Sequence, residues 1–247
     1  SGAINHDESQ SVLNAQPINL SITKNVASMM LSCLIMLAIF IPAARRYSRK
    51  GALVAPKGAQ SIVEPIVLFV RDDIIRAQID KDKADRFTPF LLTIFLFILI
   101  NNILGLIPFF PGGANASGNI SFTLTLAAFT FILTNISGSK HYWKDVFVVP
   151  GTPLPIKLML VPIEFIGLFT KPFALMLRLF ANITAGHIIV LSLVSIIFVM
   201  KTIIVAPVSV FLSIMIYCLE FLVSFLQAYI FTLLSSLFIG LAVNEHH

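Results

Sequence analysis

The sequence predicts an all-α integral membrane protein with about five membrane helices and one amphipathic helix at the membrane surface. Composition is the first reason. Of 247 residues, 57% are hydrophobic and 12% are charged, about half the charge of a soluble domain. Uncharged length is the second reason, because residues 87–139 contain no Asp, Glu, Lys, Arg or His. That stretch holds two helices of about 20 residues, each able to cross a hydrocarbon core of roughly 30 Å.

The N-terminal third carries the signals for orientation. Residues 1–24 form a polar tail, and the first membrane helix is expected at 25–44. A basic block follows at Arg45, Arg46, Arg49 and Lys50. Because loops rich in Lys and Arg stay inside, the tail is expected on the outer face, as removal of a signal peptide would leave it. At 58–79 apolar residues recur at helical spacing among many charged ones, which indicates an amphipathic helix in the inner interface.

The rest of the chain alternates between the two faces within a single membrane domain. The segment 87–110 is expected to run outward and 119–137 inward. Two longer apolar segments follow at 156–200 and 206–243, and the C-terminal end, 244–247, is expected inside. A continuous helix over 156–200 would be about 67 Å long, twice the hydrocarbon thickness. It therefore either breaks near Lys171 and Pro172 or runs steeply tilted.

Both long segments carry polar residues at membrane depth, where each ionisable group costs about 2.5–3.5 kcal/mol and is a functional hypothesis by default. At 100° per residue, four residues of 156–200 fall within about 40° of Arg178 and form one polar stripe: Glu164, Lys171, Arg178 and Asn182. His187 is expected roughly opposite this stripe. In 206–243, one face carries Glu220, Ser224 and Gln227. Two helices with narrow polar seams are expected to line a hydrated path.

Several of these residues have simpler interpretations. The Lys171 side chain can extend to the membrane surface, Glu220 and His187 can form a pair that only locks two helices, and Gln227 can bridge helices by hydrogen bonds. Arg178 is different, because a guanidinium cannot lose its charge. In a membrane it needs a counter-charge or a hydrated cavity.

Three runs carry a family resemblance. They are Asn101-Asn-Ile-Leu-Gly-Leu-Ile-Pro108, Lys171-Pro-Phe-Ala-Leu-Met-Leu-Arg-Leu-Phe-Ala-Asn-Ile-Thr-Ala-Gly-His187 and Leu226-Gln-Ala-Tyr-Ile-Phe-Thr-Leu-Leu234. Over about 25–243 the chain resembles subunit a of the F-type ATP synthases, the stator channel subunit. The resemblance implies that the two long segments form a steeply tilted helical hairpin.

The resemblance also implies roles for single residues. Arg178 matches the arginine that faces the carboxylates of a rotating c-subunit ring. Asn182 and Gln227 match polar residues lining the path, Asn102 matches a polar position on the preceding hairpin, and Glu164 matches a carboxylate of the inner half-channel. His187 and Glu220 match a proton-relay pair of the outer half-channel. Lys171 is included as a further candidate for proton translocation.

The implied function is proton translocation coupled to ATP synthesis elsewhere in the complex, since the chain has no phosphate-binding Gly-x-x-x-x-Gly-Lys-Ser/Thr loop. The expected partners are the c ring, b-type peripheral-stalk subunits, other ATP synthase subunits and lipid, without nucleic acid, cofactor or metal. The expected location is an energy-coupling membrane, with the bacterial plasma membrane favoured over the mitochondrial one. Proton and sodium coupling both stay open. A secondary transporter would predict internal repeats and a membrane metalloprotease a His-Glu-x-x-His pattern; neither is found.

Overall fold

The protein is all-helical wherever its structure is described, which confirms the predicted fold class. A computed structural model describes residues 23–50, 58–107, 116–147, 154–201 and 203–244. Within these ranges there are helices and short turns but no strand. Nearly all of the predicted polar tail at 1–24 lies outside the described residues, so its position stays a prediction.

Within the described ranges, five helices are long and apolar enough to cross a membrane. They are α1 (Lys24–Lys50), α3 (Lys81–Leu106), α4 (Ile120–Ser137), α6 (Leu154–Met200) and α7 (Ala206–Val243). Helix α3 begins at Lys81 rather than at 87, the expected start of that span. The reason is that a helix can continue through charged residues outside the hydrocarbon, whereas the prediction ended where the charges began.

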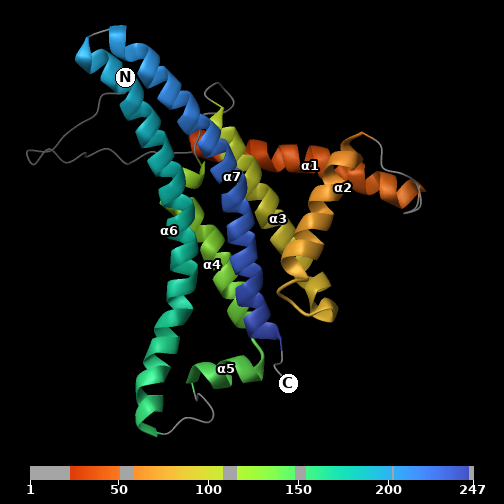
Figure 1. Cartoon of the computed structure of the whole chain (residues 1–247). Coiled ribbons are helices and arrows are strands. Elements are labelled where there is room, and N and C mark those ends of the chain that lie inside the picture. Colours follow the sequence, from red (N-terminus) through yellow and green to blue (C-terminus); the bar gives the residue numbers. More distant parts are fainter. Residues whose placement is uncertain (1–22, 51–57, 108–115, 148–153, 202, 245–247) are drawn as a thin grey trace, which may run out of the picture.

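Helix α6 is continuous for 47 residues, with Pro162 and Pro172 inside it. The break near Lys171 that the sequence left open is therefore not present. At 1.5 Å per residue the helix is about 70 Å long, more than twice a hydrocarbon core of roughly 30 Å. Helix α1 runs crosswise to α6 and α7 (Figure 1). No single membrane normal lets all five helices stand upright, so the α6–α7 hairpin must be strongly tilted if α1 is upright.

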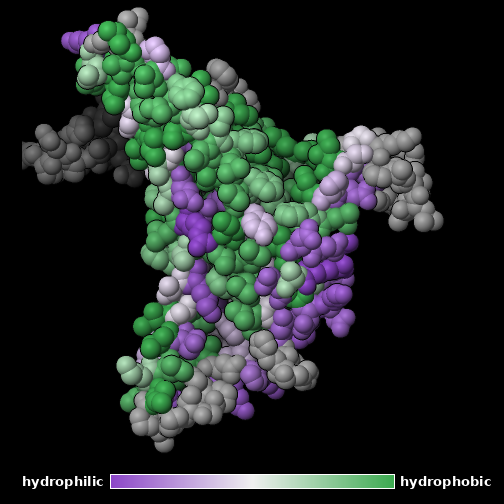
Figure 2. All heavy atoms as spheres, in the orientation of Figure 1, coloured by the Kyte–Doolittle hydropathy of each residue, from purple (hydrophilic) through white to green (hydrophobic). Residues whose placement is uncertain are grey.

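The predicted amphipathic helix at 58–79 consists of two parts. Helix α2 (Ala59–Leu68) passes directly into a π-helix, η1 (Phe69–Ile75), a widened turn that apolar periodicity does not encode. Val70, Ile74 and Ile75 are buried, while exposed Asp72 pairs with Arg71 and Arg76 at 2.9 Å each. The hydrogen bond from Arg71 holds the pKa of the Asp72 carboxyl below its ordinary value. Hydrophilic residues gather on this side of the molecule (Figure 2).

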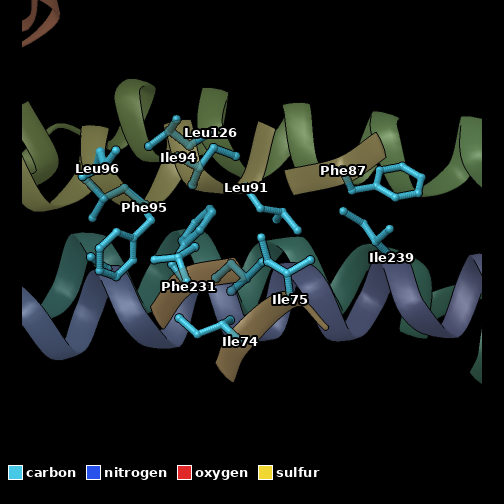
Figure 3. Close-up of a cluster of buried hydrophobic side chains, with 14 of the residues drawn as sticks. Ile74, Ile75, Phe87, Leu91, Ile94, Phe95, Leu96, Leu126, Phe231 and Ile239 are labelled. Atoms are coloured by element: carbon cyan, nitrogen blue, oxygen red, sulfur yellow. The ribbon is translucent and has the colours of Figure 1, made fainter. Parts of the chain in front are cut away.

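The core lies mainly between α3 and α7. Leu91 and Phe95 of α3 are fully buried against Phe231 and Ile239 of α7. Figure 3 shows their side chains interleaved with Ile74 and Ile75 of η1 and with Leu126 of α4. This packing fixes the register of α3 against α7, and so decides which polar residues of the two helices meet.

The C-terminal end of α7 is held at one junction with segments that are all predicted to lie inside. The Asn244 amide accepts from the Asp80 N–H at 3.2 Å and donates to the Gln78 carbonyl at 3.1 Å. Two further hydrogen bonds join Lys83 Nζ to the Val243 carbonyl and the Ser139 N–H to the Ala242 carbonyl, both at 2.8 Å. Ser139 immediately precedes α5 (Lys140–Phe147). The predicted inner ends of α3, α5 and α7 are therefore neighbours.

Candidate functional site

A small cavity lies where α3, α6 and α7 meet. Its polar lining comes from Asn102, Asn182, His187, Glu220 and Ser224. The open space is about 20 Å³, enough for roughly one water molecule. Helix α3 and the two consecutive helices α6 and α7 thus bring together four of the predicted site residues in one place.

Glu220 is the buried acid of this cavity. The residue is 8% exposed, and within the described part of the chain neither carboxylate oxygen has a hydrogen-bond partner. Gly186 of α6 allows the carboxylate to approach, because a Cβ at Gly186 would overlap Glu220 Oε1 and lie 2.8 Å from Cδ. An unsatisfied carboxylate in low dielectric is costly, so this cavity favours a bound water, a proton or a donor from His187.

His187 and Asn182 reach the cavity from opposite sides of the α6 face that packs inward. Counted from Arg178 at 100° per residue, Asn182 lies at about 40° and His187 at about 180°. Buried Leu179 falls at about 100°, and Ile183, which also lines the cavity, at about 140°. By helix angle His187 lies roughly opposite Arg178, as expected. Asn182 and His187 still line one cavity, because Leu179 and Ile183 between them form the face of α6 that packs inward.

Gln227 connects the two long helices. Its Oε1 accepts a hydrogen bond from Asn182 Nδ2 at 3.1 Å, and the residue is 2% exposed. Its Nε2 is buried without a partner in the described residues. Gln227 therefore bridges α6 and α7, and it retains one polar group for a water or an incoming side chain.

Arg178 lies one helical turn before Asn182 and points outward. Its neighbours Leu175 and Leu179 are buried, whereas Arg178 itself is exposed. None of the ion pairs among the described residues involves it. A hydrophilic strip interrupts the apolar surface between α6 and α7 (Figure 2). A permanent cation is thus presented to the surroundings of the subunit rather than neutralised within it.

Lys171 and Glu164 lie nearer the start of α6. The Lys171 ammonium sits 5.7 Å from the ring centre of Phe238 on α7, and Lys171 lines a second small cavity with Asn135 and Tyr142. The Lys171 side chain is partly buried, and its extension to the membrane surface stays a prediction. Glu164 is exposed, and burial together with the Glu164 charge raises the pKa of Tyr142 in α5.

Comparison with known proteins decides the family. The model of the ATP synthase A chain family matches residues 26–240. This chain belongs to that family. ATP synthase subunit a of Chloroherpeton thalassium is 48% identical over 233 residues, 93% of this chain and 69% of the relative. The corresponding protein of Chlorobium phaeobacteroides strain BS1 is 49% identical over 236 residues, covering 93% and 68%. That of Anaeromyxobacter dehalogenans is 41% identical over 235 residues, covering 93% and 60%.

Membership of the ATP synthase A chain family places the chain in the membrane sector of that complex, as a multi-pass subunit concerned with proton transport and ATP synthesis. Among the residues that the structure describes, no group of three His, Cys, Asp or Glu side chains is arranged to hold a metal ion. The cavity is lined by two amides, a hydroxyl, an imidazole and a carboxylate, and the Arg178 guanidinium lies one helical turn before Asn182.

Two residues of the site were not singled out by sequence reasoning. Gly186 was quoted only as part of a run, although an isolated glycine inside an apolar helix is a signal of close packing. Ser117 lies in a short turn, η2 (Ala116–Gly118), and its Oγ donates to Asn102 Oδ1 at 2.6 Å. No periodic pattern marks a serine in a turn, so only the structure identifies it.

Proposed function

We propose that this chain is the stator subunit that forms two proton half-channels and loads and unloads the carboxylates of a rotating c-subunit ring. The observation that supports this most directly is Arg178. An exposed guanidinium in the apolar body of a membrane helix, without an ion pair in the described structure, calls for a counter-charge from another chain. Carboxylates passing on a rotor supply that charge in turn.

The spacing along α6 supports two separate paths. Glu164 precedes Arg178 by fourteen residues, or about 21 Å of helix, and His187 follows it by nine, or about 14 Å. In the predicted topology α6 runs from inside to outside. Glu164 then belongs to the inner path, the His187–Glu220 cavity to the outer path, and Arg178 to the barrier between them.

The coupling follows from the cost of charge in lipid. A protonated rotor carboxyl is neutral and can face lipid, whereas the ionised form cannot do so cheaply. Arg178 attracts the ionised form and releases it once a proton arrives through one path, while a fixed cation repels protons that would cross directly. At 100 mV each proton supplies about 2.3 kcal/mol, so several must pass for each ATP made.

The outer path fits a proton relay. The His187 imidazole can both donate and accept a proton, and the Glu220 carboxylate has no hydrogen-bond partner among the described residues. Both line a cavity that holds roughly one water. The alternative, a pair that only locks α6 to α7, is less well supported because the carboxylate makes no hydrogen bond across the cavity in the described structure.

The partners belong to the same proposal. The Arg178 face receives the c ring, b-type stalk subunits hold the chain against rotation, and the bacterial plasma membrane is the setting, consistent with the bacterial relatives. The chain itself carries no ATP chemistry and uses no cofactor. Co-purification with a ring of small two-helix subunits separates this function from that of a solitary transporter.

The test is Arg178→Ala in membrane vesicles that contain the assembled complex. ATP-driven proton pumping and ATP synthesis should be abolished, while pull-down of the ring stays normal because the segment only becomes more apolar. Arg178→Lys should fail nearly as badly, since an ammonium is a compact charge that can deprotonate when desolvated. Near-normal coupled pumping in an assembled Arg178→Ala complex would overturn the proposal. Repeating the wild-type assay with and without sodium distinguishes proton from sodium coupling.

A further inference from the structure

In the cavity lined by His187 and Glu220, here called the outer cavity, the Glu220 carboxylate lacks a hydrogen-bond donor among the described residues. Both Glu220 carboxylate oxygens are buried without a partner among the described residues. The side chains of the lining that could donate a hydrogen bond to Glu220 include His187 and the amides of Asn102 and Asn182. Asn182 donates one of its two N–H groups to Gln227 at 3.1 Å. From α3 the lining residues are Asn102 and Leu106, so the orientation of the Asn102 amide determines which polar group the cavity presents to Glu220 from that side.

Two contacts select one orientation of that amide. Asn102 Oδ1 accepts from Ser117 Oγ at 2.6 Å, and Asn102 Nδ2 donates to the backbone carbonyl of Ser224 at 3.3 Å. A carbonyl only accepts, so reversing the amide would bring two acceptors together at Ser224. In the observed orientation one of the two N–H groups of Asn102 is used at Ser224, and the second is not engaged by that contact.

Ser117 is placed to act on the amide and on nothing else in the cavity. It is fully buried, it comes from η2 outside the membrane helices, and it is not among the cavity-lining residues. Asn102 is itself 2% exposed. A buried hydroxyl that donates at 2.6 Å to a buried amide oxygen holds that amide firmly, because either partner alone would be left unsatisfied.

We propose that Ser117 is a positioning residue of the outer proton path: its hydroxyl orients the Asn102 amide so that an N–H faces the Glu220 side of the cavity. This inference rests on the proposed function of the cavity. The N–H stabilises the ionised carboxylate or holds the single water beside it. The lining residues with ionisable side chains are His187 and Glu220, and along the sequence of α6 the charged residue nearest to His187 is Arg178.

The first experiment measures passive proton flux through the membrane sector in vesicles, across a range of pH, for Ser117→Ala and Ser117→Thr. Ser117→Ala should lower the flux about fivefold, the effect of losing one ordinary hydrogen bond. Its pH midpoint should also move up by roughly half to one unit, because ionised Glu220 loses a donor. Ser117→Thr keeps the hydroxyl and should retain the wild-type midpoint. Ser121→Ala, four residues away on the exposed first turn of α4, is the matched control and should change neither quantity.

The second experiment is a double-mutant cycle, which stays informative if Ser117→Ala also loosens the fold. Once Asn102 is replaced by Ala, adding Ser117→Ala should have no further effect on the pH midpoint, because Ser117 acts through that amide. Additive shifts would overturn the inference. An unchanged flux and midpoint in Ser117→Ala would overturn it too, while loss of ATP-driven pumping in an assembled Arg178→Ala complex leaves the proposed function standing. Near-normal ATP-driven pumping in assembled Arg178→Ala would overturn the proposed function itself.

Discussion

Gly240 lies so close to the backbone of Gln78 that replacing it by alanine should destabilise the fold. A Cβ there would overlap the backbone carbonyl oxygen of Gln78 and lie 3.1 Å from the carbonyl carbon. A backbone group cannot rotate away as a side chain can. Gly240→Ala therefore has to push α7 off the turn that precedes α3, where Asn244 donates to the same Gln78 carbonyl at 3.1 Å.

The size of the effect follows from three terms. Overpacking costs about 1–3 kcal/mol, and loss of the Asn244 hydrogen bond costs about 1 kcal/mol. Alanine gains about 1 kcal/mol over glycine inside a helix. Gly240→Ala should thus lower the free energy of unfolding by about 1–3 kcal/mol. Gly167→Ala is the matched control, since nothing lies within 4 Å of a Cβ at Gly167, and it should raise that free energy by about 1 kcal/mol.

The assay is thermal unfolding of the purified subunit in detergent. The single tryptophan, Trp143, stacks on Phe147 in α5 beside the junction, with ring centres 5.8 Å apart, so its fluorescence reports the event. A difference of about 2–4 kcal/mol between the two variants corresponds to roughly 4–16 °C in melting temperature. A melting temperature of Gly240→Ala at or above that of Gly167→Ala would contradict the close packing of α7 against the Gln78 carbonyl.

Two further predictions concern proton flux through the outer cavity. Gly186→Ala should slow passive flux several-fold, because the added methyl overlaps the Glu220 carboxylate. Adding Glu220→Asp, whose side chain is one methylene shorter, should recover part of the flux. Unchanged flux in Gly186→Ala would contradict the close packing of Gly186 against Glu220. His187→Ala and Glu220→Ala should each slow flux, and the exchanged double variant, His187→Glu with Glu220→His, should restore part of it because an acid–imidazole pair is kept. Independent losses without recovery in the exchanged variant would mean that the two residues act separately.

Hydropathy and charge were sufficient to predict the fold class, because a bilayer imposes length and polarity on every crossing segment. They also indicated the polar faces of the two long segments, on which Glu220 and Gln227 are both buried. They did not predict that the segment with Pro162 and Pro172 stays continuous. Proline inside a helix is tolerated where neighbouring groups satisfy the freed backbone, and that depends on packing.

The contacts that complete the cavity depended on tertiary register. Asn102 meets Ser224 only because the apolar core sets α3 against α7, and those two residues are 122 positions apart. Helix angles counted from Arg178 gave the relative directions of Asn182 and His187 but not the place of the neighbouring helices. A cavity between them was therefore invisible to periodicity, as was the part played by Ser117 in a turn.

The junction at the end of α7 makes the α6–α7 hairpin resemble a beam that is fixed at one end and free at the other. The C-terminal end of α7 is held by hydrogen bonds to the turn before α3, to the first turn of α3 and to the residue before α5. The other end, where α6 turns into α7, projects beyond the remaining helices (Figure 1). A sideways load on the Arg178 face is then carried to the clamped end through the packed α3–α7 core. The free tip is the compliant part, so elastic deflection is largest there and smallest beside the clamp.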